Sequence, residues 1–390
     1  MKRIITAISS LVILASLVAC ESAQSGPFVK DFKADVKEHF NEEQLNYLRS
    51  ENYADTTPYN GNMSKSKPVP VTFSWKSYRK KTNLWLRYKE TRFGVSRVNI
   101  AYYPNLKENN YEFYNPVFGY EYLAFAYTDS EFSPEEYRGE EEVVFTVNPT
   151  VPGPRNIYLE GVENARDIGG WGKFVNGEYK LFMKQGLIYR SGRFNEDKSE
   201  QVKVTITENG LSEINNHLRF KTEIDLRKTS TNEIGGLKDK SVLGDKVNYI
   251  QLPMAYNGNN ILTFKGKVNG DDYEYDNPSM IKQFFEILAD YNNYPINFHC
   301  SIGKDRTGCL AYLIEGLMGF DQETMYRDYM FTNFADAGLC KLTDITERYG
   351  KTIDEYTNGD TLQEKVYNYL NEVIGVSKEN LDKVISNLKE

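Results

Sequence analysis

One stretch of this chain constrains the fold more than any other, because it prescribes a strand, a loop and a helix in succession. The four residues from Ile296 to His299 form a short run that is typical of a buried strand. A helical spacing of apolar residues begins after Gly308. Cys300 therefore stands at the end of a predicted strand, and Arg306 stands near the start of a predicted helix, with one short loop between them.

The residues of this loop point to phosphate chemistry. A loop before a helix can turn successive backbone N–H groups inward, and the helix adds its positive end. The same field favours the thiolate form of Cys300, which is the nucleophilic form. The planar guanidinium of Arg306 can bind two phosphate oxygens and follow their charge into the transition state. The other residues predicted to line the anion are Ser301, Ile302, Gly303, Lys304 and Thr307.

The neighbouring residues have supporting roles in this interpretation. Gly303 gives the backbone the freedom to turn. Thr307 can donate a hydrogen bond to the departing sulfur, and His299 is expected to orient the loop rather than to carry a proton. The alternative, a structural cysteine in a core turn, does not account for the Lys304-Asp305-Arg306 triplet beside it.

The run His299-Cys300-Ser301-Ile302-Gly303-Lys304-Asp305-Arg306-Thr307-Gly308 resembles the Cys-five-residues-Arg signature of the protein tyrosine phosphatase superfamily. Its fuller form is similar to that of the bacterial tyrosine and phosphoinositide phosphatases. Further matches extend from about Asn164 to the C-terminus. They are Asn164-Ala165-Arg166-Asp167-Ile168-Gly169-Gly170, Tyr189-Arg190-Ser191-Gly192, Ile224-Asp225-Leu226-Arg227 and Tyr326-Arg327-Asp328-Tyr329. Ala165 departs from the aromatic residue usual in that family.

The resemblance implies an α/β phosphatase domain with a largely parallel central sheet flanked by helices, a phosphocysteine intermediate and no cofactor. A general acid must protonate the leaving oxygen. Asp305, in the loop itself, is the favoured candidate. Asp225 at a predicted strand end is the second, unless it is a structural carboxylate paired with an arginine. Arg166 and Asp167 are expected to form an internal ion pair that holds the entry segment.

The role of Lys304 stays open. Lys304 either adds a charge that suits multiply phosphorylated ligands or is a solvated loop lysine. No group of His, Cys and carboxylate residues has the spacing of metal ligands, so no metal site is predicted.

The first twenty residues are predicted to be a targeting segment. Lys2 and Arg3 precede an apolar stretch that ends in Ala19-Cys20, which resembles a bacterial lipoprotein signal with lipidation at Cys20. The alternatives are an ordinary secretory signal and a spanning anchor, for which the stretch is short. The protein is therefore expected to be an exported bacterial lipoprotein, anchored in a membrane and facing the periplasm or the cell exterior.

The rest of the chain divides by composition. Residues 21–67 are polar and are predicted to be a tether. Residues 68–150 contain short strand-like runs with turn signals, which favours a small all-β sandwich domain similar to fibronectin-type-III or immunoglobulin modules. A Pro-rich linker precedes residues 155–390, where strand-like and helix-like runs alternate, as expected for the cysteine-dependent phosphatase domain.

The predicted function is hydrolysis of phosphomonoesters, on phosphotyrosine proteins and with phosphoinositides as a further substrate class. The alternatives are an inositol polyphosphate phosphatase of the same superfamily and a non-catalytic binding lipoprotein. The net charge of -8 argues against a general nucleic-acid binder. The expected partners are a phosphorylated protein or phosphoinositide and, through Cys20, a membrane.

Overall fold

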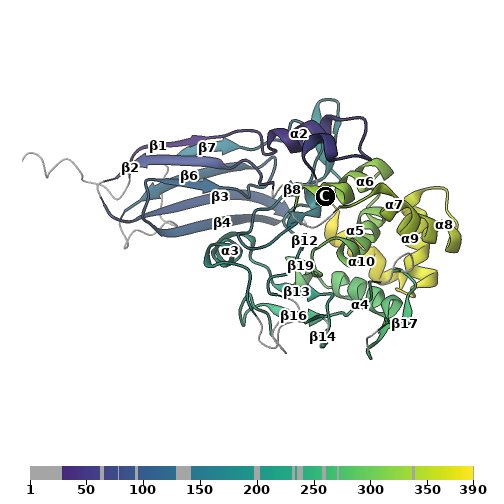
Figure 1. Cartoon of the computed structure of the whole chain (residues 1–390). Coiled ribbons are helices and arrows are strands. Elements are labelled where there is room, and N and C mark those ends of the chain that lie inside the picture. Colours follow the sequence, from purple (N-terminus) through teal and green to yellow (C-terminus); the bar gives the residue numbers. More distant parts are fainter. Residues whose placement is uncertain are drawn as a thin grey trace, which may run out of the picture.

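The computed structural model describes residues 29–61, 66–77, 79–92, 95–128, 142–196, 203–230, 233–234, 240–256, 261–269, 272–335 and 339–389. The predicted signal segment and Cys20 lie outside these residues. Among the residues described, no helix has the length and apolar character needed to cross a membrane. The chain forms an all-β half that is joined to an α/β half (Figure 1).

The all-β half consists of two antiparallel sheets, one with the strand order β1-β2-β5 and one with the order β4-β3-β6-β7. In β2 the alternating residues Val71, Phe73 and Trp75 are buried between the two sheets. The Phe73 ring contacts the Phe145 ring of the other sheet, with centroids 5.6 Å apart. The likeness to fibronectin or immunoglobulin modules stays a prediction. The strands are β1 (Lys30–Asp35), β2 (Val71–Lys76), β3 (Thr82–Arg92), β4 (Val95–Leu106), β5 (Asn110–Phe113), β6 (Glu121–Tyr127) and β7 (Val143–Thr146).

The predicted tether over residues 21–67 is wrong for residues 29–61, which pack into both halves. β1 pairs antiparallel with β2 in the first sheet. Helix α2 (Glu42–Arg49) buries Tyr47 in the core of the α/β half. Arg327 of that half donates a hydrogen bond to the Tyr47 carbonyl oxygen at 3.3 Å. The packing was not predicted because the segment is polar on average. A few buried aromatic residues, such as Phe40, are nevertheless enough to attach it to the core.

The α/β half is built on a six-stranded sheet with the order β16-β13-β19-β12-β9-β8. Its first four strands in this order are parallel, but β9 pairs antiparallel with both β12 and β8. The sheet is therefore mixed, a correction to the largely parallel sheet that was predicted, because β8 and β9 are too short to show a strand pattern. The strands are β8 (Arg155–Asn156), β9 (Arg166–Asp167), β12 (Ile188–Ser191), β13 (Thr222–Asp225), β16 (Asn248–Gln251) and β19 (Ile296–His299).

Three small hairpins lie outside the large sheet. They are β10 (Gly172–Val175) with β11 (Glu178–Leu181), β14 (Thr229–Ser230) with β15 (Glu233–Ile234), and β17 (Lys265–Lys267) with β18 (Glu274–Asp276).

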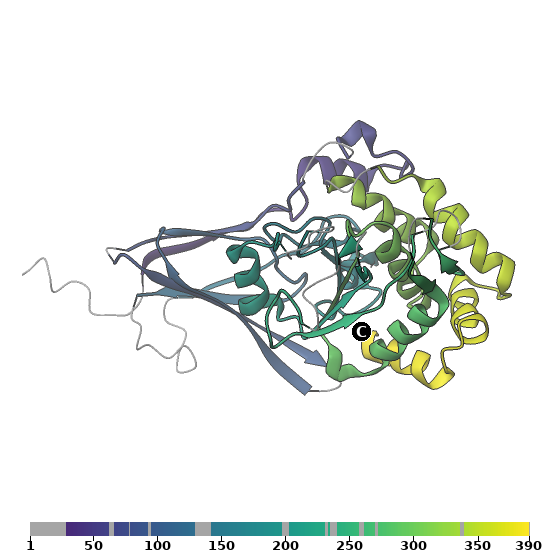
Figure 2. The same ribbon diagram turned by 60° about the horizontal axis from the view of Figure 1, so that its bottom comes forward.

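The helices that follow β18 gather at the end of the molecule away from the two antiparallel sheets, whereas α3 lies beside β4 (Figures 1 and 2). In β12 the neighbours Ile188 and Tyr189 belong to two separate cores, as expected for side chains that point to opposite faces of a sheet. The α-helices are α3 (Glu208–Glu213), α4 (Asn277–Ala289), α5 (Asp305–Leu317), α6 (Gln322–Phe331), α7 (Leu342–Ile345), α8 (Lys351–Tyr356), α9 (Leu362–Asn368) and α10 (Lys378–Leu388). The 3-10 and π turns are η1 (Thr57–Tyr59), η3 (Ile168–Gly170), η4 (Ile214–Leu218), η6 (Tyr291–Asn293), η7 (Thr332–Phe334), η8 (Thr346–Gly350) and η9 (Tyr369–Val373).

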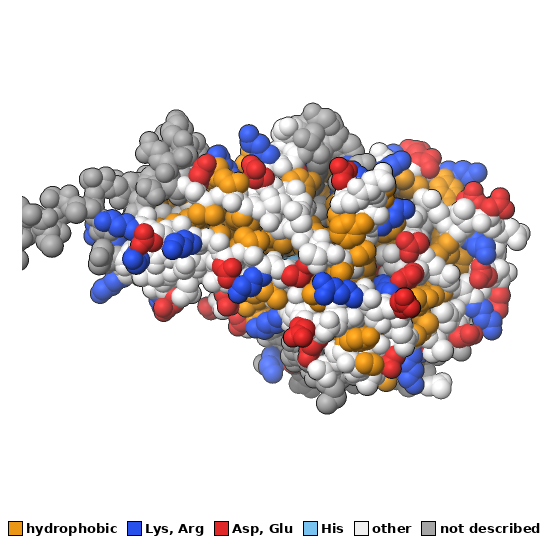
Figure 3. All heavy atoms as spheres, turned by 90° about the horizontal axis from the view of Figure 1, so that it is seen from above, with side chains coloured by type: hydrophobic (Ala, Val, Ile, Leu, Met, Phe, Trp, Pro, Cys, Tyr) orange, Lys and Arg blue, Asp and Glu red, His pale blue; other side chains and the backbone are white. Residues whose placement is uncertain are grey.

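Buried polar bonds join the two halves. The Glu213 carboxylate accepts hydrogen bonds from the Tyr103 hydroxyl and the Asn115 amide, both at 2.8 Å. The Gln185 side chain bonds to both the N–H and the carbonyl of Phe118, each at 3.0 Å. The sandwich is therefore attached by specific contacts and not by the linker alone. On the face seen from above, basic and acidic side chains are interspersed, with hydrophobic side chains exposed between them (Figure 3).

We expect Phe40→Ala to lower the free energy of unfolding by about 3–5 kcal/mol, the usual cost of removing a buried phenyl ring. Phe40 is 2% exposed and contacts Phe118 of the sandwich and Phe331 of the α/β half. Urea unfolding measures the change. Val36→Ala, at a position 38% exposed in the same segment, is the control. Equal, small effects of both changes would contradict the packing described here.

Candidate active site

The sheet places Cys300 at the edge where its parallel strands end. β19 lies between β12 and β13 and runs parallel to both. Cys300 follows its last residue and is 2% exposed. Five residues after Cys300 the chain enters α5 at Asp305. In α/β sheets this carboxyl edge is the usual place for ligands, so the loop has the position and the helix start that an anion site needs.

The backbone of the loop is fixed at Gly303. This residue has a φ of +70°, and an added Cβ would come within 2.6 Å of the Ser191 carbonyl oxygen. Its own carbonyl accepts hydrogen bonds from Arg190 at 2.8 Å and from the Asn164 amide at 2.9 Å. Only glycine therefore fits here, and two side chains from other strands and loops hold the turn.

Asp328 of α6 organises the side chains behind the loop. It accepts hydrogen bonds from Arg190 at 2.7 Å, from Arg166 at 2.8 Å and from the Trp171 indole at 2.9 Å. Burial alone would raise the pKa of Asp328, but the charges of Arg166 and Arg190 outweigh it and hold the pKa well below its usual range. The ionised carboxylate thus fixes Arg190, which in turn holds Gly303.

Arg166 and Asp167 do not pair with each other, which corrects the predicted ion pair. Arg166 binds Asp328, whereas Asp167 binds Arg155 at 2.8 Å. Both belong to β9, and successive side chains of a strand point to opposite faces. Each residue is still part of an internal ion pair, but the two pairs lie on different sides of the sheet.

Arg306 and Thr307 lie at the start of α5 and are buried. Arg306 is 7% exposed, and its Nη1 lies 3.4 Å from the Leu226 carbonyl and 3.5 Å from the Met254 carbonyl. The hydroxyl of Thr307 is buried and has no hydrogen-bond partner among the described residues. A buried orphan hydroxyl is costly, which suits a group that bonds to a reacting species.

The three remaining residues of the loop, Ser301 among them, are only partly buried. Ser301 accepts bonds from Arg193, whose backbone N–H lies 3.1 Å from the Ser301 carbonyl and whose Nη1 lies 3.2 Å from its hydroxyl. Ile302 and Lys304 are partly exposed, and Lys304 donates to the Leu339 carbonyl at 2.6 Å. Lys304 and Arg193 therefore add two cations at the loop.

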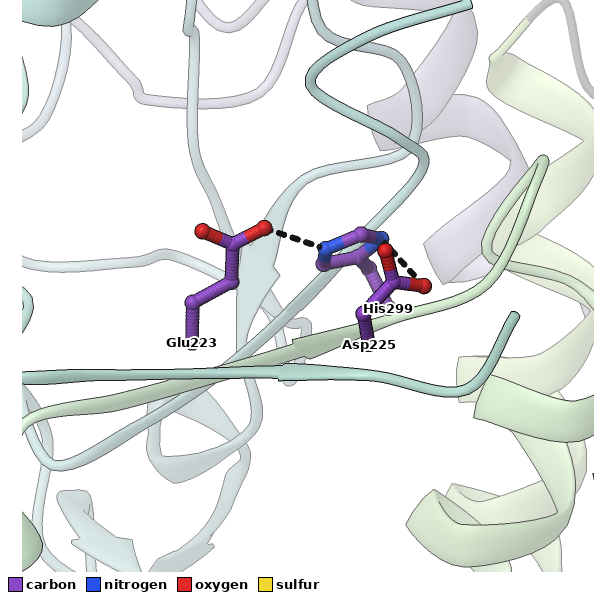
Figure 4. Close-up of side chains that lie close together, drawn as sticks. All are labelled: Glu223, Asp225 and His299. Atoms are coloured by element: carbon purple, nitrogen blue, oxygen red, sulfur yellow. Dashed lines mark hydrogen bonds and ion pairs between the residues drawn. The ribbon is translucent and has the colours of Figure 1, made fainter. Parts of the chain in front are cut away.

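His299 is held at both ring nitrogens (Figure 4). Its Nε2 lies 2.9 Å from Glu223, and its Nδ1 lies 3.2 Å from the Cys300 carbonyl and 3.9 Å from Asp225. This agrees with an orienting role. Ligand atoms of His299, Glu223 and Asp225 lie within 4.8 Å of one another, a spacing that a metal ion could use. They already bond to each other and to Arg227, so we assign no metal to them.

Asp225 has the surroundings of a structural carboxylate. Its side chain is fully buried and pairs with Arg227 at 2.8 Å, and it accepts a bond from the Tyr249 hydroxyl at 3.1 Å. Burial would raise the pKa of Asp225, but the charges of Arg227 and His299 outweigh it and lower the pKa. An ionised carboxylate held in this way has no proton to give.

Asp305 has the surroundings of a proton donor. It is the first residue of α5, and its side chain is 15% exposed. Arg348 donates a hydrogen bond to Oδ1 at 3.0 Å. Burial raises the pKa of Asp305, although Lys304 and Arg348 oppose the shift. The protonated form is therefore favoured in comparison with an ordinary aspartate.

Sequence reasoning gave no role to several residues that hold the site. Asn164, Arg190 and Asp328 stood within the motifs of the family resemblance, and this was the signal that could have marked them. Arg193 and Arg348 had no such signal.

Comparisons with known proteins identify relatives of the α/β half. Residues 157–390 match the family model described as "Tyrosine phosphatase family". OCA1 of Meyerozyma guilliermondii, whose name places it among tyrosine-protein phosphatases, is 32% identical over 106 residues, or 25% of this chain and 57% of the relative. The chain thus spans little more than half of that relative's length.

Two solved structures of the Siw14 catalytic core are also similar. The match to one of them covers 50% of this chain and 87% of the solved chain, at 17% sequence identity and a TM-score of 0.29. The other is described as the core catalytic domain of a PP-IP phosphatase from S. cerevisiae in complex with citrate. The match to it covers 45% of this chain and 89% of the solved chain, at 19% sequence identity and a TM-score of 0.27. Scores this low support no structural argument.

We expect Gly303→Ala to reduce kcat/KM on an aryl phosphate by about a hundredfold, because a displaced loop misplaces its catalytic groups. Tungstate affinity, measured by calorimetry, should fall with it. Gly177→Ala is the matched control, since Gly177 has a φ of +83° and open space around an added Cβ. Equal effects of the two changes would show that backbone strain, and not the contact with Ser191, decides the outcome.

Proposed function

Because this chain belongs to the tyrosine phosphatase family, whose model matches residues 157–390, we propose that it hydrolyses phosphomonoesters through a phosphocysteine intermediate. The observation that carries the proposal is the loop between β19 and α5. It combines a buried cysteine, a helix start and Arg306 with a turn that Asn164 and Arg190 hold through Gly303.

The reaction has two steps. The Cys300 thiolate attacks phosphorus, so that a P–S bond forms as the P–O bond to the leaving group breaks. The backbone N–H groups of the loop and Arg306 bind the phosphoryl oxygens, and Asp305 gives its proton to the leaving oxygen. Water then attacks phosphorus, Asp305 takes a proton from it, and phosphate leaves with the thiolate regenerated. None of these steps calls on a cofactor.

We assign phosphotyrosine proteins as the first substrate class and phosphoinositides as the second. Inositol polyphosphates are the alternative, and the observation that favours them is the pair of extra cations, Lys304 and Arg193, at the loop. The additional phosphate groups of an inositol polyphosphate would bind to these cations. Rates measured side by side on phosphotyrosine peptides, phosphoinositide vesicles and inositol hexakisphosphate separate the three classes.

The location of the enzyme is a further part of the proposal. The Ala19-Cys20 sequence after an apolar stretch supports an exported lipoprotein of bacterial type, held in a membrane by acyl chains on Cys20. We also propose that the all-β half is a fibronectin-like module.

We expect Cys300→Ser to abolish turnover of p-nitrophenyl phosphate, with a loss on the order of 10⁵-fold or more, because removal of a covalent nucleophile has costs of this size. Tungstate should still bind, since Arg306 and the loop N–H groups are unchanged. Cys309→Ala, in the buried core of α5, is the control and should keep its turnover. Near-normal turnover by Cys300→Ser would refute the assignment of the nucleophile and with it the proposed function.

For the anchor, we expect Cys20→Ala to prevent incorporation of labelled fatty acid and to move the protein from the membrane pellet to the soluble fraction. Labelling of whole cells followed by immunoprecipitation measures the first effect. Cys340→Ala controls for general effects of removing a cysteine, because Cys340 is buried. Persistent label in Cys20→Ala would exclude lipidation at this residue.

A further inference from the structure

The helical segment of residues 342–356 was absent from the sequence-based expectations, yet it packs against Asp305. Arg348 lies within its π-helical turn η8 and donates from Nη1 to Asp305 Oδ1 at 3.0 Å. The next residue, Tyr349, donates its hydroxyl hydrogen bond to the Asp305 backbone carbonyl at 2.8 Å. Two consecutive residues of one turn therefore hold both the side chain and the backbone of Asp305.

Arg348 is itself fixed from two sides. Its Nη2 lies 3.1 Å from Asp344 Oδ1, and its guanidinium lies 5.6 Å from the centre of the Tyr256 ring. The side chains of Arg348, Asp305 and Asp344 are 16%, 15% and 15% exposed. One planar guanidinium thus spans two carboxylates in a partly buried place, where its orientation is well defined.

This arrangement has a direct chemical consequence. A general acid transfers its proton efficiently only when the oxygen that carries the proton is held within hydrogen-bond reach of the accepting oxygen. The bond from Arg348 occupies Asp305 Oδ1, so Oδ2 is left as the oxygen that can carry the proton.

The charges around Asp305 come from two directions. Lys304 and Arg306 flank it along the chain at the start of α5, and Asp344 of α7 and Arg348 of η8 face it. The three cations favour the carboxylate, whereas burial and the negative charge of Asp344 favour the protonated form, and the net result is a raised pKa of Asp305. Asp344 therefore offsets part of the charge of Arg348, which can hold Asp305 without forcing it to ionise.

We propose that Arg348, with its charge shared by Asp344, is a positioning residue that orients the Asp305 carboxyl for proton transfer to the leaving oxygen. The proton passes from Asp305 Oδ2 to that oxygen as the P–O bond breaks, and Asp305 recovers a proton from the water that attacks the phosphocysteine. This inference rests on the proposed function, and within it on Asp305 as the acid.

The first experiment measures kcat/KM on aryl phosphates whose leaving groups range from dinitrophenol to phenol. Arg348→Met removes the guanidinium but keeps a long side chain. It should lose about tenfold to a hundredfold on phenyl phosphate, a fraction of the hundredfold to ten-thousandfold typical of general acid catalysis, and little on the dinitrophenyl ester. Arg348→Lys keeps the charge without the fork and should lose less. Lys351→Met, an exposed cation on the adjoining helix, is the control and should match the wild type.

The second experiment combines Arg348→Met with Asp305→Asn. If Arg348 acts through Asp305, its replacement should cost nothing further once Asp305 is replaced, so the two losses should not add. A merely structural residue would instead depress all leaving groups alike and would add to the loss from Asp305→Asn. Either of these results would overturn the inference.

The pH profile supplies a readout that a structural role would not move. The acid must be protonated, so kcat/KM falls as pH rises through its pKa. Loss of a neighbouring cation in Arg348→Met should move this basic limb to higher pH. Loss of a neighbouring anion in Asp344→Asn should move it to lower pH. Shifts in the same direction, or no shifts, would count against the proposal.

Failure of the inference and failure of the proposed function can be told apart. If Cys300→Ser keeps its turnover, the proposed function fails whatever Arg348 does. If Cys300→Ser is inactive but Asp305→Asn shows no dependence on the leaving group, the enzyme is a cysteine phosphatase with another acid, and the role of Arg348 is overturned alone. Unchanged tungstate binding and melting temperature in Arg348→Met show that the variant is folded.

Discussion

The buried carboxylate of Asp328 is the interaction on which the rest of the site depends. Two guanidinium groups, those of Arg166 and Arg190, lie in the protein interior and bind to it. Buried charges of this kind are tolerated only when they are paired and hydrogen-bonded. Burial and the charge of Asp328 raise the pKa of Glu315 beside them well above its usual value, which favours its protonated form. Asp328 therefore neutralises only one of the two cations behind the Cys300 loop.

The same strand that supplies Arg166 connects the loop to the all-β half. Asp167 faces the other way and binds Arg155, whose Nη1 donates to the Asn115 carbonyl of the sandwich at 3.1 Å. The path from the sandwich to Gly303 is therefore short and made of buried ion pairs. Such pairs are costly to break, because the remaining partner is left as an unpaired buried charge. The sandwich and the phosphatase half are best regarded as one structure.

The sequence was sufficient where the signal is local. The strand, loop and helix around Cys300 follow one another along the chain, and β19 lies where the run from Ile296 to His299 predicts it. The sequence was insufficient where a residue forms an ion pair with a residue that is distant along the chain. The partner of Arg166 lies 162 residues away, and Arg348 is 43 residues from Asp305. No periodicity encodes such a pairing. The tether prediction failed for the related reason that composition does not show which few aromatic residues find a core.

The choice between the two acid candidates shows how environment, and not residue type, assigns a role. Asp225 is bound to Arg227, two residues further along the chain, and its pKa is lowered although it is fully buried. Asp305 shares its guanidinium partner with a second carboxylate, so burial prevails and its pKa is raised. Opposite pKa shifts of two carboxyl groups are the pattern expected of a structural anion and a proton donor, which is the division we propose. Because Asp305 belongs to the first turn of the helix that follows the Cys300 loop, the proposed donor and the proposed anion site would keep a fixed geometry relative to each other.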